Sequence, residues 1–278
     1  MSSRSIVGFD GSEPSKAALA WALGRGDPVL IAHVADAEAG LIGPDYAREI
    51  EARGADLVAR ALDDVTRRFP DADVDAVVLE GPVAWALAQV AQPGDTLVIG
   101  THKTGFLHGR VLGSRSVEVA MLAPCDVMVV PTIDLRFRSG VVAGIAAGAG
   151  LRAVVEAAAR AAADRGEELL LLHSADDRTA SGERAVVAEA LALARDCAPD
   201  IVIRTRTSNR HTAELLLDAS RGRALLVLGS GTGDRARSPI GSVLHDVLLN
   251  MTAPVLVTHA GAPTGPDAVS APGGTAAR

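Results

Sequence analysis

The chain has 278 residues, of which 48% are hydrophobic, so it is long enough for two ordinary domains that each bury a core. Its 27 lysine and arginine residues and 34 acidic residues give a formal charge of -7, and no stretch concentrates the basic residues, which argues against a nucleic-acid partner. The longest apolar stretch, 141–151, is much shorter than the roughly 20 residues of a membrane helix, so we expect no membrane partner.

The first residues lead directly into a strand pattern without the apolar region of a signal peptide, which predicts a cytoplasmic location. The two cysteines agree with this prediction. Cys125 and Cys197 lie in different halves of the chain and lack metal-ligand spacing. We therefore interpret them as small buried residues in a reducing compartment.

Short apolar runs alternate with amphipathic stretches along the first half, which predicts alternating strands and helices. The first strand is closed by Asp-Gly-Ser, and Pro14 lies near the start of the helix that follows it. The expected strands are 5–10, 28–34, 74–79, 96–100 and 127–131, and the expected helices are 12–25, 45–69, 83–91 and 113–122.

The second half repeats this order of elements. The clearest sign is that the stretch 97–131 has a looser copy at 226–259, each with a strand, a glycine-containing loop, a Gly-Ser step, a helix and a strand. The expected strands are 140–145, 168–173, 201–207, 224–229 and 255–258, and the expected helices are 150–165, 182–197, 212–220 and 241–251.

Strands that alternate with helices favour a parallel sheet, and apolar runs such as LVIG and VMVV are typical of strands that are buried on both faces. The sequence therefore predicts an α/β protein of two tandem five-stranded parallel-sheet units, with helices on both faces. We expect the first domain at 1–134 and the second at 138–260. Residues 261–278 are rich in glycine, alanine and proline without periodicity, which predicts a disordered tail.

Open parallel sheets bind ligands outside the carboxyl ends of their strands, where the strand order reverses. A flavodoxin-like order would place Asp10 and Gly100 beside one another, because each closes its strand. Glycines at 100, 105 and 109 let the following loop approach a ligand, and Gly113-Ser114 opens a helix whose N-terminus favours an anion. The phosphates of a nucleotide are the natural anion for such a loop.

These residues carry a resemblance: the chain is similar to tandem universal stress proteins, over both halves and without the tail. The family's ATP-binding pattern has a glycine, two residues, a glycine, nine residues, and then a glycine with serine or threonine. Gly100, Lys103, Gly113 and Ser114 fall on these positions, so the second glycine is missing. The resemblance implies the flavodoxin-like, adenine nucleotide alpha hydrolase-like fold and ATP as the ligand.

The resemblance also implies contacts on the adenosine side of the nucleotide. Asp10 matches an aspartate that closes the first strand in the family, Val34 matches a valine that closes the second, and Gly81 matches a glycine at the end of the third. Arg115 and Ser116 lie in the first turn of the helix after Ser114, so they are candidate neighbours of the phosphates or simply surface residues.

Two of these residues have a second interpretation. Asp10 either contacts the nucleotide or only caps the helix that follows it, and both roles are compatible. Lys103 either pairs with phosphates or fills the space that a glycine would leave for the ligand. His102 and His108 lie in the same loop, but no catalytic partner is identifiable for them, so we interpret them as solvated side chains.

Four further residues are assigned structural roles. Trp21 and Trp85 lie on amphipathic helix patterns, so we expect both to pack in the core. His33 and His173 lie at matching positions near the ends of second strands, where a hydrogen-bonded, partly buried histidine is favoured over a metal ligand.

The second half departs further from the family pattern. Ala146 stands where the first half has Asp10, and Arg210 stands opposite Gly81. The loop 229–241 is also one residue shorter than the loop 100–113. We therefore expect a poorer or absent nucleotide site here. The resemblance implies a structural service for this half, in which the two units pair through their last strands as an intramolecular pseudo-dimer.

The sequence thus predicts a cytoplasmic stress-response protein that binds ATP in its first half and acts as a switch for a protein partner, with no catalytic residues and no metal ligands of its own. One alternative is a slow ATP hydrolase in which Mg2+ bridges the phosphates. Another is an interaction scaffold that binds no nucleotide. The sequence leaves open which partner is bound and whether two chains form a homodimer.

Overall fold

The computed structural model describes residues 3–35, 44–102, 114–175, 180–231 and 241–259. The predicted tail at 261–278 lies outside these residues. Within them, the first half contains β1 (Ser5–Gly8), α1 (Glu13–Leu23), β2 (Val29–Ala35), α2 (Pro44–Arg68), β3 (Val74–Glu80), α3 (Val83–Val90), β4 (Thr96–Thr101), α4 (Ser114–Leu122) and β5 (Asp126–Pro131).

The second half contains β6 (Val141–Ile145), α5 (Leu151–Arg165), β7 (Leu169–Ser174), α6 (Ala180–Cys197), β8 (Ile203–Ser208), α7 (Thr212–Ser220), β9 (Leu225–Gly229), α8 (Ser242–Asn250) and β10 (Val255–Thr258). Every expected element is present with its expected type, and its bounds differ from the prediction by at most two residues.

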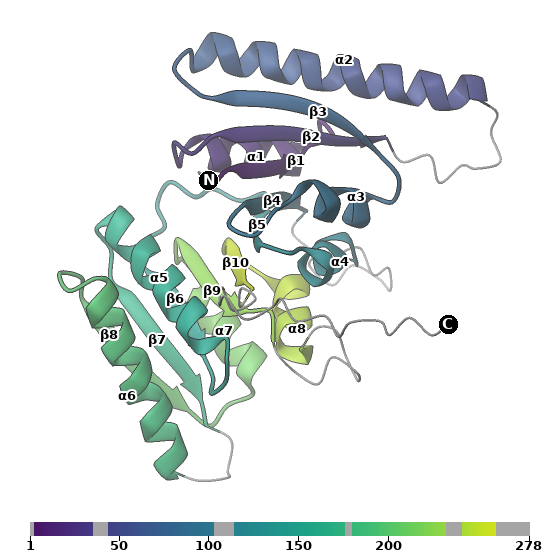
Figure 1. Ribbon diagram of the computed structural model, residues 1–278. Coiled ribbons are helices and arrows are strands. Elements are labelled where there is room, and N and C mark those ends of the chain that lie inside the picture. The colour runs from purple at the N-terminus through teal and green to yellow at the C-terminus, as the bar shows by residue number, and fades with distance from the viewer. Residues whose placement is uncertain (1–2, 36–43, 103–113, 176–179, 232–240, 260–278) are drawn as a thin grey trace, which may run out of the picture.

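All ten strands form one sheet in the order β3-β2-β1-β4-β5-β10-β9-β6-β7-β8 (Figure 1). Neighbouring strands within each half run parallel, as in the pairing of Gly8 with Ile99 between β1 and β4. The α/β prediction of two five-stranded parallel units is therefore confirmed, and the flavodoxin-like reversal lies between β1 and β4 in the first half and between β6 and β9 in the second.

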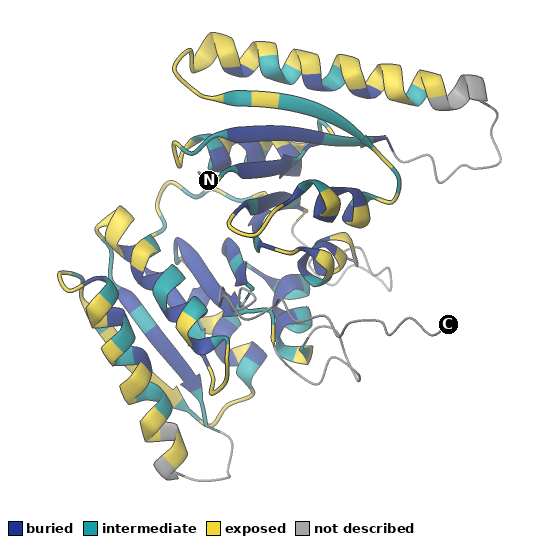
Figure 2. Ribbon diagram, viewed as in Figure 1, coloured by how far each residue is buried: buried dark blue, intermediate teal, exposed yellow. Residues whose placement is uncertain are grey.

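Helices cover both faces of this sheet. Helices α1, α2, α5 and α6 pack on one face, and α3, α4, α7 and α8 pack on the other, so each of the two apolar core clusters extends across both halves. Burial is deepest in the central strands, as Figure 2 shows. The central strands are continuous apolar runs because both of their faces are covered, whereas the edge strand β8, IRTRTS, is largely exposed.

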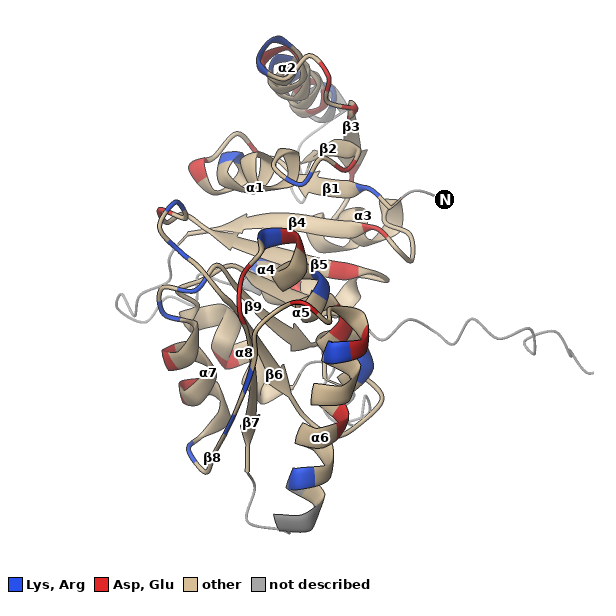
Figure 3. Cartoon of the chain, turned by 90° about the vertical axis from the view of Figure 1, so that its left-hand side faces the viewer, with Lys and Arg blue, Asp and Glu red and all other residues tan. Residues whose placement is uncertain are grey.

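The exposed surface of helix α2 carries many charged side chains of both signs. Along α2, arginines pair with acidic residues three or four positions away, for example Arg53 with Glu49. In the view of Figure 3, basic and acidic segments are interspersed rather than gathered into one basic surface. None of the described helices is long and apolar enough to cross a membrane.

The halves meet where β5 pairs with β10, and this pairing is antiparallel, with Met128 opposite Leu256. We call this junction the seam. The backbone N–H of His259 donates to the Asp126 carboxylate at 2.9 Å, and the His259 ring bonds the carbonyl of Ala120 at 2.9 Å. Arg138 donates to the carbonyl of Thr252 at 2.6 Å. Polar contacts therefore fix the register of the seam at its edges.

The structure tests the predictions for the tryptophans and the cysteines. Trp21 packs against a core cluster, but Trp85 is 53% exposed, so the prediction that both are core residues is wrong for Trp85. Helical spacing alone did not locate the apolar face of the short helix α3, because nearly all of its residues are apolar. Cys125 is buried, as predicted, and burial raises the pKa of its thiol to about 11. Cys197, at the end of α6, is only half-buried, so the prediction that both cysteines are buried is wrong for Cys197.

Asp126 makes the stability of the seam sensitive to pH. Burial raises the pKa of its carboxyl above the ordinary value, although the His259 N–H and the charges of His259 and Arg160 oppose that shift. A carboxyl whose pKa is raised by folding contributes stability at low pH and loses that contribution as pH rises through the folded-state pKa. The ionised Asp126 therefore costs stability at neutral pH.

We expect Asp126→Asn to raise the free energy of unfolding at pH 7.5, because the amide oxygen still accepts from the His259 N–H without burying a charge. The difference from the wild type should shrink as pH falls through the folded-state pKa and vanish below about pH 3, where the carboxyl is protonated in both states. Urea unfolding at several pH values measures it, with Asp75→Asn on the exposed edge strand as the control. A variant less stable than the wild type at pH 7.5 would contradict this account.

Candidate functional site

The candidate site lies at the carboxyl edge of the first-half sheet, where the strand order reverses between β1 and β4. From β1 the chain builds outward through β2 and β3, and it then returns to β4 on the other side of β1. The helices that follow β1 and β4 leave toward opposite faces of the sheet, which opens a crevice between the strand ends in folds of this kind. Asp10 follows β1, and Gly100 lies near the end of β4.

The Asp10 carboxylate is held by a tight turn. Its Oδ1 accepts a hydrogen bond from the backbone N–H of Ser12 at 3.0 Å. Partial burial raises the pKa of Asp10, but hydrogen bonds from the side chain and backbone of Ser12 outweigh burial, and the pKa lies below its ordinary value. The side chain is exposed at the strand end. Asp10 therefore presents an exposed negative charge that the turn holds in place.

The N-cap of α1 is Ser12 and not Asp10. The Ser12 Oγ accepts from the backbone N–H of Ser15 at 3.4 Å, and Pro14 occupies a position in the first turn that tolerates proline. Asp10 supports this cap by bonding to Ser12. The capping alternative for Asp10 is thus replaced by an indirect role, and the run Ser-Glu-Pro before an apolar helix pattern was the signal for Ser12.

Gly100 is required by packing. A Cβ atom on Gly100 would lie 2.0 Å from the carbonyl oxygen of Pro14 and 2.7 Å from the backbone nitrogen of Ser15. The first turn of α1 therefore rests directly on β4 beside the strand end. Gly100 was predicted to give the following loop freedom near a ligand, whereas in the structure it allows α1 to pack directly against the sheet.

Val34 and Gly81 lie at the same edge. Val34 is half-buried near the end of β2 and pairs with Leu79 of β3. Gly81 directly follows β3 with φ +106, a backbone conformation that favours glycine. Asp10, Val34, Gly81 and Gly100 thus follow or end four neighbouring strands, β1 to β4.

The phosphate side of the predicted site is described only in part. Lys103, Gly113 and His108 lie outside the described residues, as does the side chain of Ser114. The backbone of Ser114 begins α4, and in the first turn of that helix Arg115 is exposed and Ser116 is buried. The predicted phosphate contacts of these residues stay predictions.

The two matched histidines have the same structural role. Nδ1 of His33 bonds the carbonyl oxygen of Phe9 at 2.8 Å, and Nδ1 of His173 bonds that of Ile145 at 2.9 Å. Each therefore ties its second strand to the residue at the end of the first strand of its half. Among the described residues, no group of three or more histidine, cysteine, aspartate or glutamate side chains is placed to hold a metal ion.

The strand registers confirm how the halves correspond. His33 pairs with Val78, and its counterpart His173 pairs with Thr207, so three residues further along Gly81 corresponds to Arg210. The Arg210 side chain turns to Asp218, which its guanidinium contacts at 2.8 Å. On the neighbouring strand, Ala146 follows β6 where Asp10 follows β1.

Comparisons with known proteins agree with this architecture. A model of the universal stress protein family matches residues 1–131. A universal stress protein of Thermus aquaticus is 30% identical over 137 residues, which cover 45% of this chain and 96% of that protein. The chain belongs to the universal stress protein family. A universal stress protein of Mycobacterium tuberculosis is 26% identical over 287 residues, covering 91% of this chain and 96% of the relative.

The double-unit fold also has a solved counterpart. The crystal structure of a universal stress protein from Archaeoglobus fulgidus superposes with a TM-score of 0.71 at 16% identity, covering 92% of this chain and 96% of that one. This likeness shows a shared fold across both halves.

The seating of α1 on Gly100 predicts a large difference between two equivalent glycines. Gly100→Ala should lower the free energy of unfolding by about 1–3 kcal/mol, because the backbone of α1 must shift to admit a methyl group. Gly229→Ala should change it by about 0.5 kcal/mol or less, because a Cβ there would lie 3.4 Å from the side chain of Val154, an ordinary contact. Urea unfolding of both variants measures the difference, and equal effects would contradict the packing role.

Proposed function

We propose that the first half binds ATP or a related adenine nucleotide at the carboxyl edge of β1, β2 and β4, and that binding acts as a switch in a stress response. The observation that carries this proposal is the position of Asp10 and Gly100 at the reversal of strand order, the location where open parallel sheets bind their ligands. Membership of the universal stress protein family supports the choice of an adenine nucleotide.

Asp10 supplies the adenosine side of the proposed site. Its carboxylate is ionised at neutral pH, and beyond the hydrogen bonds that already hold it in the turn it can accept from hydroxyl or amino groups of a ligand. Val34 adds half-buried apolar surface on the neighbouring strand. A nucleoside, which combines an apolar ring with hydroxyl donors, matches these two groups.

The start of α4 supplies the phosphate side. The N-terminus of a helix favours an anion, and Arg115 places a positive side chain in its first turn. In this proposal, Lys103 pairs with the phosphates and Mg2+ accompanies them. The nucleotide prefers one arrangement of the loop 100–113 and thereby changes a surface that a protein partner reads.

Helix α4 also connects this site to the seam. It begins at Ser114 beside the proposed phosphates, packs against α8 of the second half, and carries the Ala120 carbonyl that the His259 ring bonds. A shift at the start of α4 therefore acts on contacts between the halves. This link favours a switch over a catalyst, since it allows nucleotide binding to change the contacts between the two halves. A cytoplasmic location stays a prediction from the sequence.

Calorimetric titration of the full chain with ATP and with AMP tests the proposal. We expect Asp10→Ala to weaken binding by about 10–100-fold, since a hydrogen bond to a charged group contributes about 1.5–3 kcal/mol. Asp27→Ala is the matched control, because Asp27 lies before β2 at the opposite edge of the sheet and pairs with Arg25 at 3.0 Å.

The controls separate the competing functions. Absence of heat from the wild type with either nucleotide would reject nucleotide binding and favour the scaffold. Incubation with ATP and Mg2+ followed by chromatography should recover intact ATP after hours, whereas steady release of ADP would favour a slow hydrolase. Equal losses of affinity in both aspartate variants would move the site away from Asp10.

A further inference from the structure

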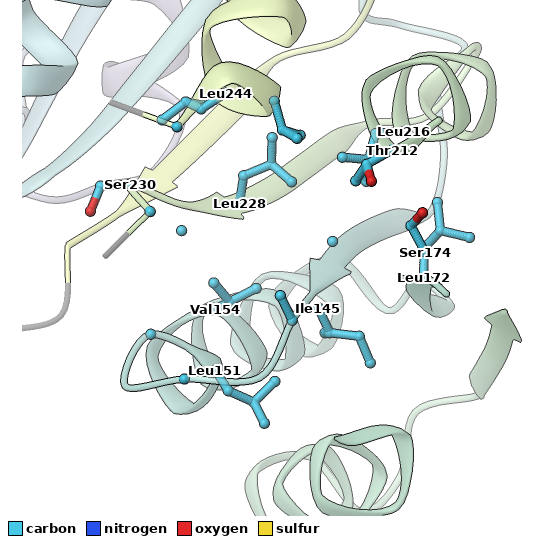
Figure 4. Close-up of a pocket in the computed structure, with 18 of the residues that line it drawn as sticks. Ile145, Leu151, Val154, Leu172, Ser174, Thr212, Leu216, Leu228, Ser230 and Leu244 are labelled. Atoms are coloured by element: carbon cyan, nitrogen blue, oxygen red, sulfur yellow. The ribbon is translucent and has the colours of Figure 1, made fainter. Parts of the chain in front are cut away.

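The second half contains a cavity of about 230 Å³ at its own carboxyl edge. It lies beyond the ends of β6, β7 and β9, between the first turns of α5, α7 and α8 (Figure 4). Its place in the second half is the one that the proposed nucleotide site has in the first half. From the sequence, we expect a poorer or absent nucleotide site at this edge.

The lining of this cavity carries no charged side chain among the described residues. Figure 4 shows aliphatic side chains around the space, with hydroxyl groups at a few positions on its wall. The aliphatic members include Ile145, Val154, Leu172, Leu216, Leu228 and Leu244, and the hydroxyl members are Ser174, Thr212, Ser230 and Thr258. Two of these hydroxyls already donate hydrogen bonds to backbone carbonyls, Ser174 to that of Arg210 and Thr258 to that of Leu228.

The cavity is open because α5 begins later than α1. The N-cap Gly150 lies six positions after Gly144, whereas the N-cap Ser12 lies four positions after the equivalent Gly8. The first turn of α5 consequently stands away from β9, and no backbone atom of α5 lies close to Gly229 in the way that Pro14 lies on Gly100. Two additional loop residues thus replace a packed contact with a space.

Polar groups of the first-half edge have apolar counterparts in this lining. Ala146 replaces Asp10, as the strand registers show. Counting from the glycines that precede the last helices, Val243 replaces Arg115 and Leu244 replaces Ser116.

A phosphate in this cavity would meet only helix N-termini and no basic side chain among the described lining residues. In the first half the helix N-terminus is joined by the basic side chain of Arg115, whereas here Val243 stands at that position, so a phosphate would be stabilised less. The chemistry of this edge therefore differs from that of the first half.

We propose that this cavity binds an uncharged, mostly apolar molecule about the size of a fused two-ring compound such as indole. An apolar cavity of about 150 Å³ accommodates benzene, so the larger space here suits a bicyclic ring. The hydroxyls of Thr212 and Ser230 belong to the lining and lie on opposite sides of the space in Figure 4, so either one offers a partner for a polar group of the molecule. This proposal does not depend on nucleotide binding by the first half.

Titration of the ¹⁵N-labelled full chain with indole, followed by NMR, tests the proposal. We expect saturable shifts of amide signals from the lining residues, with a Kd below about 1 mM. Shifts that do not saturate, or that lie elsewhere, would overturn it. If AMP shifts the same amide signals further and binds with a lower Kd than indole, the proposal is also overturned, because the cavity would then be a nucleotide site.

Two pairs of measurements locate the ligand. Val154→Phe projects a ring into the space, so it should weaken indole binding by at least about tenfold while leaving the melting temperature at or above that of the wild type. Ala146→Asp adds a charge at the lining and should also weaken binding, whereas Ala149→Asp, an exposed position in the same loop outside the lining, should not. Unchanged affinity in a folded Val154→Phe variant would reject the cavity as the site.

Discussion

The antiparallel pairing of β5 with β10 is the contact on which the rest of the structure depends. Each half ends in a strand of nearly continuous apolar residues, and a five-stranded unit alone would leave that strand as an open edge. Pairing the two edges removes both, and it merges two small cores into layers that extend across the whole sheet. The polar contacts of Asp126 and His259 add to the register that the buried faces of these apolar strands already specify.

The two halves share their strand order and some of their packing contacts but differ in the side chains at the carboxyl ends of their strands. Both halves keep the strand order, the histidine that bonds the end of the first strand, and the glycine at the end of the fourth. They differ where backbone geometry does not constrain the side chain, as at Asp10 and Ala146. A fold of this kind supports its own stability through buried strands, which leaves the strand ends able to acquire or lose a ligand independently.

Most of the fold follows from the hydrophobic periodicity of the sequence and from the glycine and proline residues at its turns, because buried parallel strands and amphipathic helices have distinct hydrophobic patterns. The type of each element was predictable, and so was the reversal beside Asp10 and Gly100. Tertiary contacts were not. The contact of Gly100 with the first turn of α1 depends on Pro14, which is far away in sequence, and the exposure of Trp85 depends on which side of a nearly all-apolar helix meets the sheet. The second-half cavity depends on where α5 starts, which no motif records.

The seam has a geometric consequence for how the two edges work together. Because β5 and β10 run in opposite directions, all strands of one half point against those of the other, and the two carboxyl edges face opposite ends of the sheet. No small molecule can bridge them, and neither competes with the other for space. A macromolecule that contacted both carboxyl edges at once would have to extend along the full length of the strands. Any influence of one edge on the other must therefore pass through the protein itself, by way of α4, α8 and the seam.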